Sequence, residues 1–222
     1  MMNKLPERCN DLQGLNKLVR AMLELALEDI RSQGVNPLVV ETYRPQERQN
    51  YLYCQGRTIA ECVAKGLNQS FSTAYSNPKA GKITWTLNSV HKSRKAVDIV
   101  PQRKVKGKMA AIWDINDPET QIIIKTMQKY GFEAGANWSN SPDSPHFQVK
   151  GDFTSAFDAK HTTPYVTKAI QAQLNKLKCN DLSVDGKWGP ATTEAVNVFR
   201  RCRGYKTAFG QIGAEAFRAL FS

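Results

Sequence analysis

The spacing of apolar positions changes several times along the N-terminal half of the chain. Hydrophobic residues at three- and four-residue steps over 15–30 predict an amphipathic helix, which Gly34 can end. The run LVVET at 38–42 predicts a short strand, and PQERQNYLYCQ at 45–55 predicts a second helix. The polar segment 56–81 contains Gly and Ser and predicts a long loop with little regular structure.

Two further short apolar runs indicate strands. They are AVDIV at 96–100 and HFQV at 146–149, and a helix separates them. That helix has Asp117 as a good N-cap, Pro118 in its first turn and Gly131 as a stop. This order of elements predicts an α+β domain in which helices flank a small antiparallel sheet.

The texture of the sequence changes at KGDFTSAFDAKHTTPY, residues 150–165, which is polar and ends in a Thr-Thr-Pro break. Helical spacing resumes over 166–177, after Pro190 and over 214–221, which predicts a small all-α three-helix domain. We therefore expect a first domain at 1–152, a linker at 153–164 and a second domain at 165–222.

The chain is strongly basic, with a formal net charge of +11 and a sequence pI near 9.5. This charge favours a polyanionic partner, either a nucleic acid or an anionic bacterial wall. We expect no specific nucleic-acid binding, because the sequence has no DNA- or RNA-binding signature and no basic helix with aromatic stacking residues. The apolar runs are too short to predict a membrane span.

The cysteines and the N-terminal sequence indicate in which cellular compartment the protein is made. Five scattered cysteines form no CxxC pair, so we expect reduced thiols. The start MMNKLPERCNDLQG lacks the apolar core of a secretory signal peptide. If the substrate lies outside the cytoplasm, a separate route must export the protein.

Two of the three histidines lie beside the predicted strands, at His91 and His146, and Asp98 lies inside the apolar run AVDIV. A buried ionised carboxylate is costly unless it is paired or bound to a metal. Two imidazoles and one carboxylate can form a three-ligand zinc site with an open fourth position. Each residue alone also has an ordinary interpretation, as a loop histidine, a salt-bridged strand residue and a satisfied core histidine.

Asp143 changes that balance. It precedes His146 by three residues, which places a second carboxylate near a candidate ligand, where a zinc hydrolase needs a general base. No HExxH segment occurs, so the helical zinc-binding arrangement of thermolysin is excluded. The metal could also be another divalent ion.

These residues carry a resemblance to a known family. SVHKSRKAVDIV and DSPHFQ resemble the SxH(x)6D and DxPHF motifs of the VanY-like D-alanyl-D-alanine carboxypeptidase family of zinc peptidases. TYRPQERQNYLYCQGRT at 42–58 and ITW at 83–85 are similar to its phage endolysin branch, the L-alanyl-D-glutamate peptidases. The similarity covers most of residues 5–150, with four blocks in the same order.

The resemblance implies zinc ligands at three positions, a general base at Asp143 and, at Arg44, a side chain that stabilises negative charge on the scissile carbonyl. The implied ligands are His91, Asp98 and His146. Arg44 can alternatively form a surface ion pair with Glu41 or Glu47. Ser89 can orient a ligand from outside the metal site or simply cap a turn. One departure is Arg94, which stands where the family usually has glycine.

The C-terminal segment resembles the three-helix peptidoglycan-binding domain through its turn DGKWGPAT at 185–192. Glycines permit a tight turn there, and Pro190 can start the next helix. The resemblance makes Asp185 and Trp188 candidate wall-binding residues, although Trp188 can also belong to the core.

The resemblance as a whole implies a monomeric zinc endopeptidase of the phage-lysin type that acts on bacterial peptidoglycan, at the L-alanyl-D-glutamate bond of the stem peptide. Such an enzyme would be made in the bacterial host cytoplasm and leave through a separate pore such as a holin. Two alternatives stay open from the sequence. One is a D,D-carboxypeptidase that removes terminal D-alanine, and the other is a non-catalytic wall-binding protein whose zinc is structural.

Overall fold

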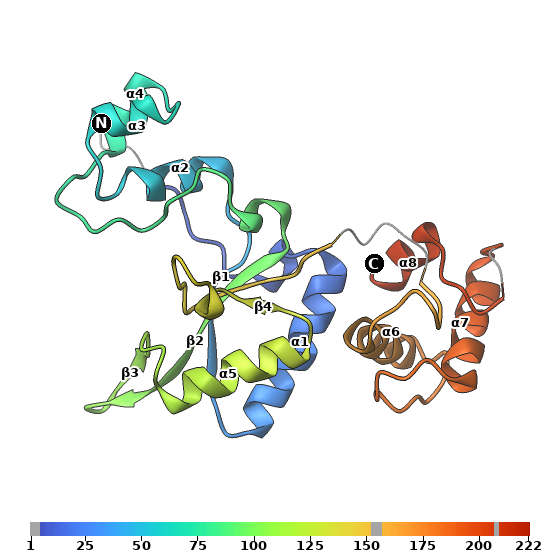
Figure 1. Ribbon diagram of the computed structural model, residues 1–222. Coiled ribbons are helices and arrows are strands. Elements are labelled where there is room, and N and C mark those ends of the chain that lie inside the picture. The colour runs from blue at the N-terminus through green and yellow to red at the C-terminus, as the bar shows by residue number, and fades with distance from the viewer. Residues whose placement is uncertain (1–4, 152–156, 207–208) are drawn as a thin grey trace. The chain divides into compact units, whose positions relative to one another are not determined.

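A five-stranded sheet organises the computed structural model, which describes residues 5–151, 157–206 and 209–222 (Figure 1). The strand order is β1-β2-β5-β4, and β3 pairs with β2 off this path. The β2–β3 and β4–β5 pairs are antiparallel. The expected fold class, a small antiparallel sheet flanked by helices and followed by further helices, is confirmed. The strands are β1 Pro37–Glu41, β2 Ala96–Val105, β3 Lys108–Ala111, β4 Glu133–Ala134 and β5 His146–Gln148.

The chain divides into two units. The first unit comprises Met1–Leu15 and Val39–Asp98, and the second comprises Asn16–Leu38 and Ile99–Ser222. Strand β2 is continuous across the division, so Asp98 and Ile99 are consecutive residues of one strand. The described residues also form three short 3-10 turns: η1 Leu12–Gly14, η2 Val90–Ser93 and η3 Gly135–Asn137.

Helices α1 (Lys17–Ser32) and α5 (Pro118–Lys129) lie side by side in the second unit (Figure 1). The Asn16 side chain accepts from the Leu18 N–H and caps α1, a contact worth about 1 kcal/mol. Asp117 caps α5 in the same way, as the sequence predicts. The predicted apolar stripe lies on the buried face of α1, to which the structure adds Leu27: Leu18, Val19, Met22, Leu23, Ala26, Leu27 and Ile30.

The predicted long loop at 56–81 is wrong, because two short helices occupy much of it. After α2 (Gln46–Cys54), helix α3 (Ile59–Ala64) begins at a capping box of Thr58 and Glu61, and α4 (Gln69–Tyr75) begins at an Asn68 cap. Both helices are too short to show a clear apolar repeat. They pack around a small core, which consists of Tyr53, Cys54, Cys62 and Leu67 with Phe71, Tyr75 and Leu87 against it.

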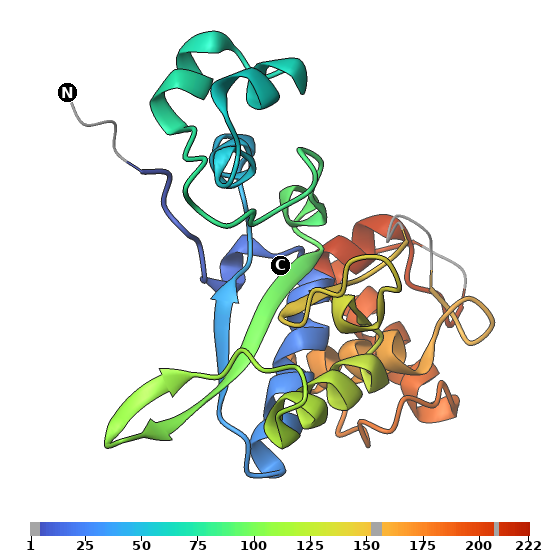
Figure 2. The same cartoon turned by 60° about the vertical axis from the view of Figure 1, so that its left-hand side comes forward.

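Strand β2 runs on past the predicted 96–100 segment and folds back as β3 (Figure 2). Val105 faces Lys108 in the register, so the loop is the two-residue pair Lys106 and Gly107. Both have positive φ, 50° and 81°, as a tight hairpin turn requires. This hairpin was not predicted, because lysine is an unusual residue at such a position.

Three C-terminal helices follow: α6 Pro164–Lys176, α7 Pro190–Arg203 and α8 Ala214–Leu220. Helix α6 contacts both α7 and α8, in agreement with the three predicted helical segments. Of the predicted linker, residues 153–156 lie outside the described residues. Phe157 forms a β-bridge with Ile212, and the domain boundaries at 152 and 165 stay a prediction. Among the described residues, no helix is long and apolar enough to cross a membrane.

Candidate metal centre

His91 is presented by a short 3-10 turn, η2. The Ser89 hydroxyl accepts from the His91 N–H at 3.4 Å and caps this turn, which matches the turn-capping interpretation of Ser89. Arg94 ends the turn in the left-handed region, with φ 61°. Non-glycine residues rarely adopt this region, so Arg94 stands at a position that favours glycine.

The imidazole of His91 is fully buried and held on both sides. Its Nδ1 lies 2.6 Å from the Thr42 carbonyl oxygen, and its Nε2 lies 3.0 Å from Oδ1 of Asp98. A backbone carbonyl can only accept, so Nδ1 carries the proton and donates to Thr42. In the neutral ring the lone pair of Nε2 is therefore directed toward Asp98.

Asp98 lies in β2 with a side chain that is 13% exposed. Arg44 donates from Nη2 to its second oxygen, Oδ2, at 3.0 Å and to Glu41 at 2.7 Å. Glu41 is also paired with Arg48, so two carboxylates and two guanidiniums compensate one another in this partly buried network. The predicted ion pair between Arg44 and Glu41 is thus present, but it is not on the surface.

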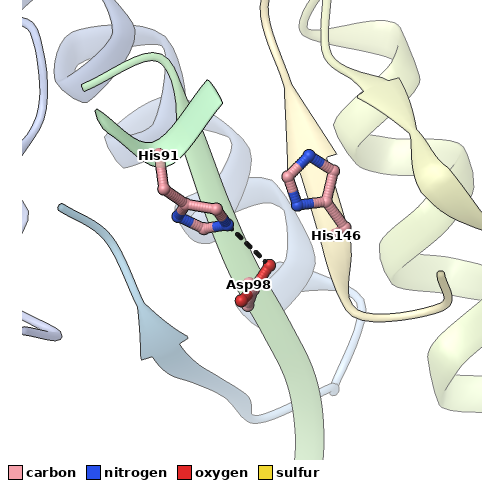
Figure 3. Close-up of side chains that lie close together, drawn as sticks. All are labelled: His91, Asp98 and His146. Atoms are coloured by element: carbon pink, nitrogen blue, oxygen red, sulfur yellow. Dashed lines mark hydrogen bonds and ion pairs between the residues drawn. The ribbon is translucent and has the colours of Figure 1, made fainter. Parts of the chain in front are cut away.

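His146 is the first residue of β5, and the carbonyl of Pro145 before it accepts from the Ile99 N–H at 2.8 Å. This bond fixes β5 against the residue that follows Asp98 in β2. The His146 ring contacts the Trp138 ring, with centroids 5.2 Å apart, and its Nε2 lies 3.2 Å from Oε1 of Gln148. Figure 3 shows the other ring nitrogen directed toward Asp98.

The structure brings the three predicted ligands together. His91, Asp98 and His146 each offer one ligand atom, and these atoms lie within 4.8 Å of one another (Figure 3). When His91 is neutral, its Nε2 lone pair faces Asp98 at 3.0 Å, an arrangement that a shared cation stabilises. Two neutral imidazoles and one carboxylate form the ligand set of a catalytic zinc site, so the residues fit such an ion.

Asp143 is not one of the three clustered ligands. Its side chain is exposed, and its backbone carbonyl accepts from the His146 N–H at 3.2 Å. Its N–H donates to Gly135, where an added Cβ would come within 2.7 Å of the Asp143 carbonyl oxygen. Because Gly135 has no Cβ, the Asp143 backbone can lie close to it. The role of the Asp143 carboxylate stays a prediction.

The predicted wall-binding residues lie in the turn before α7. Asp185 accepts from the Lys187 N–H at 2.8 Å and from the Gln171 side chain at 3.0 Å, and these bonds lower the pKa of its carboxyl. Gly186 has φ 80°, and an added Cβ would meet the Pro164 carbonyl at 2.7 Å. Trp188 is half-buried and donates to Thr193. These contacts give the turn its shape, and binding there stays a prediction.

Several residues around the site were missed by sequence reasoning. Thr42 acts through its backbone carbonyl, which has no residue-type signature. Gln148 lies in the HFQ segment beside His146, and Glu133 faces it across β4 and β5. The remaining histidine, His161, is exposed and bonded to Asp158 in the predicted linker.

Solved structures similar to this chain include an endopeptidase and a D,D-pentapeptidase. The Serratia marcescens L-Ala D-Glu endopeptidase ChiX is 26% identical, with 63% of this chain and 83% of that chain covered and a TM-score of 0.38. A point mutant of the vancomycin resistance D,D-pentapeptidase VanY from a VanB-type cassette, in complex with Zn(II), is 19% identical. The match covers 62% of this chain and 73% of the VanY chain, with a TM-score of 0.33.

A protein-family comparison covers the site itself. Residues 82–149 match the family model described as D-alanyl-D-alanine carboxypeptidase, peptidase family M15. This range includes Asp143 and all three residues of the metal cluster, whereas Arg44 lies outside it. The segment of the chain that carries the candidate metal centre is therefore similar to this peptidase family.

Proposed function

We propose that the protein is a zinc-dependent peptidase that hydrolyses the peptide stems of bacterial peptidoglycan at the L-alanyl-D-glutamate bond. The observation that carries the proposal is the cluster of His91, Asp98 and His146 within 4.8 Å, inside the segment that matches a peptidase family. The choice of bond rests on the sequence blocks at 42–58 and 83–85, which resemble the L-alanyl-D-glutamate peptidases.

The bound zinc and Asp143 have different roles in the proposed hydrolysis. When bound, zinc polarises the scissile carbonyl and lowers the pKa of a water molecule toward about 7. The Asp143 carboxylate accepts a proton from the attacking water and passes it to the leaving amine. General acid-base catalysis of this kind raises the rate about 100- to 10,000-fold. Its exposure is compatible with contact to a substrate.

Arg44 has two possible contributions. In this structure its guanidinium is bonded to Asp98 and Glu41, so it holds the ligand carboxylate in place. The sequence resemblance assigns it to negative charge on the scissile carbonyl, which would act where charge develops in the transition state. Metal affinity and turnover, measured separately, distinguish the two roles.

The C-terminal helices supply the proposed wall attachment. The DGKWGPAT turn and the basic character of residues 165–222 support binding to an anionic wall, and nine basic residues outnumber four acidic ones over 162–222. A monomeric phage lysin that leaves the host through a holin-type pore is the context we propose for this combination.

Digestion of purified peptidoglycan, followed by mass spectrometry of the products, tests the proposal. We expect stems cleaved between L-alanine and D-glutamate, with a new amino terminus on glutamate. Release of free D-alanine with otherwise intact stems would instead establish the D,D-carboxypeptidase, the activity for which the matched family is named. Metal analysis of the purified protein checks that the ion is zinc.

A further inference from the structure

A chain of hydrogen bonds leads from Glu133 through Gln148 to His146. The Gln148 side-chain nitrogen donates to Oε2 of Glu133 at 2.9 Å, and its oxygen lies 3.2 Å from Nε2 of His146. Glu133 and Gln148 are direct partners in the antiparallel β4–β5 pair. Their side chains therefore start from adjacent positions on the same face of the sheet.

The charge state of Glu133 determines which groups donate and which accept in this series of hydrogen bonds. The Gln148 amide, desolvation, the Lys150 ammonium and the Trp138 indole N–H act on its carboxyl, and the net effect lowers the pKa of Glu133 below its usual value. Trp138 donates to Oε1 at 3.2 Å, and the Lys150 nitrogen lies 3.0 Å from Oε2. An ionised carboxylate can only accept, so the NH₂ group of Gln148 must face Glu133.

The orientation of Gln148 then determines the protonation of His146. With its NH₂ group on Glu133, Gln148 presents a carbonyl oxygen to Nε2, so Nε2 carries the proton and donates. The lone pair is left on Nδ1, the nitrogen on the side of Asp98 in Figure 3. His91 has the opposite arrangement, because the Thr42 carbonyl holds the proton on Nδ1, and the lone pair of the neutral ring is then on Nε2.

We propose that Glu133 and Gln148 are positioning residues that fix His146 as a metal ligand through Nδ1. The inference rests on the metal site of the proposed function, and it is independent of which bond is cleaved. Loss of an outer hydrogen-bond partner of a metal-bound histidine weakens metal binding about 10- to 100-fold.

Zinc titration of the full chain with Glu133→Gln and Gln148→Met tests the inference. We expect the zinc dissociation constant to rise about 10- to 100-fold in both variants. Glu119→Gln is the matched control, because Glu119 is 31% exposed against 32% for Glu133 and pairs with Arg103 instead. Its affinity should change less than about 2-fold, since it lies outside the hydrogen-bonded chain.

Two further measurements separate positioning from general structural damage. Nitrogen-15 NMR of the metal-free protein should show His146 protonated at Nε2 in the wild type and a mixture of tautomers in Glu133→Gln, where the Gln148 amide is free to turn over. The double variant Glu133→Gln/Gln148→Glu again places a carboxylate beside Nε2 and an amide donor behind it. We expect it to recover most of the zinc affinity.

Three results would overturn the inference: unchanged zinc affinity in both single variants, a wild-type His146 protonated at Nδ1, or no zinc binding by the wild type. None of these measurements uses peptidoglycan. A protein that passes them but releases D-alanine, or cleaves nothing, would contradict the proposed function and leave the positioning role intact.

Discussion

Arg44 donates to Oδ2 of Asp98 at 3.0 Å, while the other oxygen of that carboxylate faces His91. The two oxygens of Asp98 are thus divided between a cation of the protein and the metal cluster. This division orients the carboxylate, because rotation of the side chain would break the contact with Arg44. A ligand held in this way loses less conformational entropy when a metal binds.

Replacement of Arg44 should therefore weaken metal binding and not only catalysis. We expect Arg44→Met to raise the zinc dissociation constant about 10-fold, because an outer-sphere partner of a ligand is lost. Arg48→Met is the control, since Arg48 is buried and is also paired with Glu41. Arg48 donates to the Pro6 carbonyl, whereas Arg44 donates to Asp98. Isothermal titration with zinc measures both. Equal affinities in the two variants would restrict Arg44 to the transition state.

Asp143 should affect turnover and leave the metal in place. We expect Asp143→Asn to lower kcat at least about 100-fold, because the amide cannot accept the proton of the attacking water. Zinc content should stay at the wild-type level, since Asp143 is outside the ligand cluster. Muropeptide release and metal analysis on the same sample give both numbers. Full activity with zinc retained would remove Asp143 as the base.

The cluster of His91, Asp98 and His146 was predictable from the sequence because each residue has a local signature. His91 and Asp98 are seven positions apart in one motif, and His146 opens a short apolar strand. Asp117 and its helix were predictable for the same reason, since a cap acts within its own first turn. Local signals of this kind do not depend on how distant segments pack.

Other features depend on contacts that no local pattern encodes. The bond from His91 to the Thr42 carbonyl joins residues 49 positions apart through a backbone atom. The Glu133 contact with Gln148 requires the β4–β5 register. The helices at 59–64 and 69–75 were missed for a different reason: they are too short to show an apolar repeat, although Thr58 and Asn68 cap them locally.

Arg94 occupies a backbone conformation that costs a non-glycine residue about 1 kcal/mol or more. Two contacts offset that cost: its guanidinium lies 4.1 Å from the Tyr43 ring centroid and donates to the Gly14 carbonyl at 2.9 Å. Arg94→Ala loses both contacts and keeps the strain, so we expect a loss of about 1–2 kcal/mol in unfolding free energy. Arg94→Gly relieves the strain and should be about 1 kcal/mol more stable than Arg94→Ala.

Urea denaturation of the two Arg94 variants, each with zinc removed, measures this difference. The alanine variant controls for the lost side chain, because only the backbone preference separates it from glycine. Equal stability of the two variants would mean that the left-handed conformation at residue 94 carries no cost in this chain.

The charge on Asp117 should stabilise the fold in a pH-dependent way. Hydrogen bonds from Arg103 and from backbone N–H groups hold the pKa of Asp117 below 3.8, its ordinary value. A lowered folded-state pKa gives stability that is present above about pH 4 and is lost as the pH falls through the folded value. Asp117→Asn keeps the cap but removes the charge, so we expect a loss of about 1 kcal/mol at pH 7.

The difference between wild type and Asp117→Asn should shrink as the pH falls below about 4 and vanish once Asp117 is protonated in the folded state. Urea unfolding from about pH 7 down to about pH 2.5 follows this convergence. A difference that stays constant over the range would assign the effect of the substitution to packing rather than to charge.

Zinc should stabilise the folded chain through His91 and not through His161. At a free concentration about 100 times its dissociation constant, a ligand that binds only the folded state adds about 2.7 kcal/mol to the unfolding free energy. We expect this gain in the wild type and in His161→Ala, because His161 is 70% exposed and bonded to Asp158. His91→Ala should lose it, since a ligand of the cluster is gone. Thermal unfolding with zinc and with a chelator compares the three proteins, and a zinc-dependent gain that survives in His91→Ala would place the ion elsewhere.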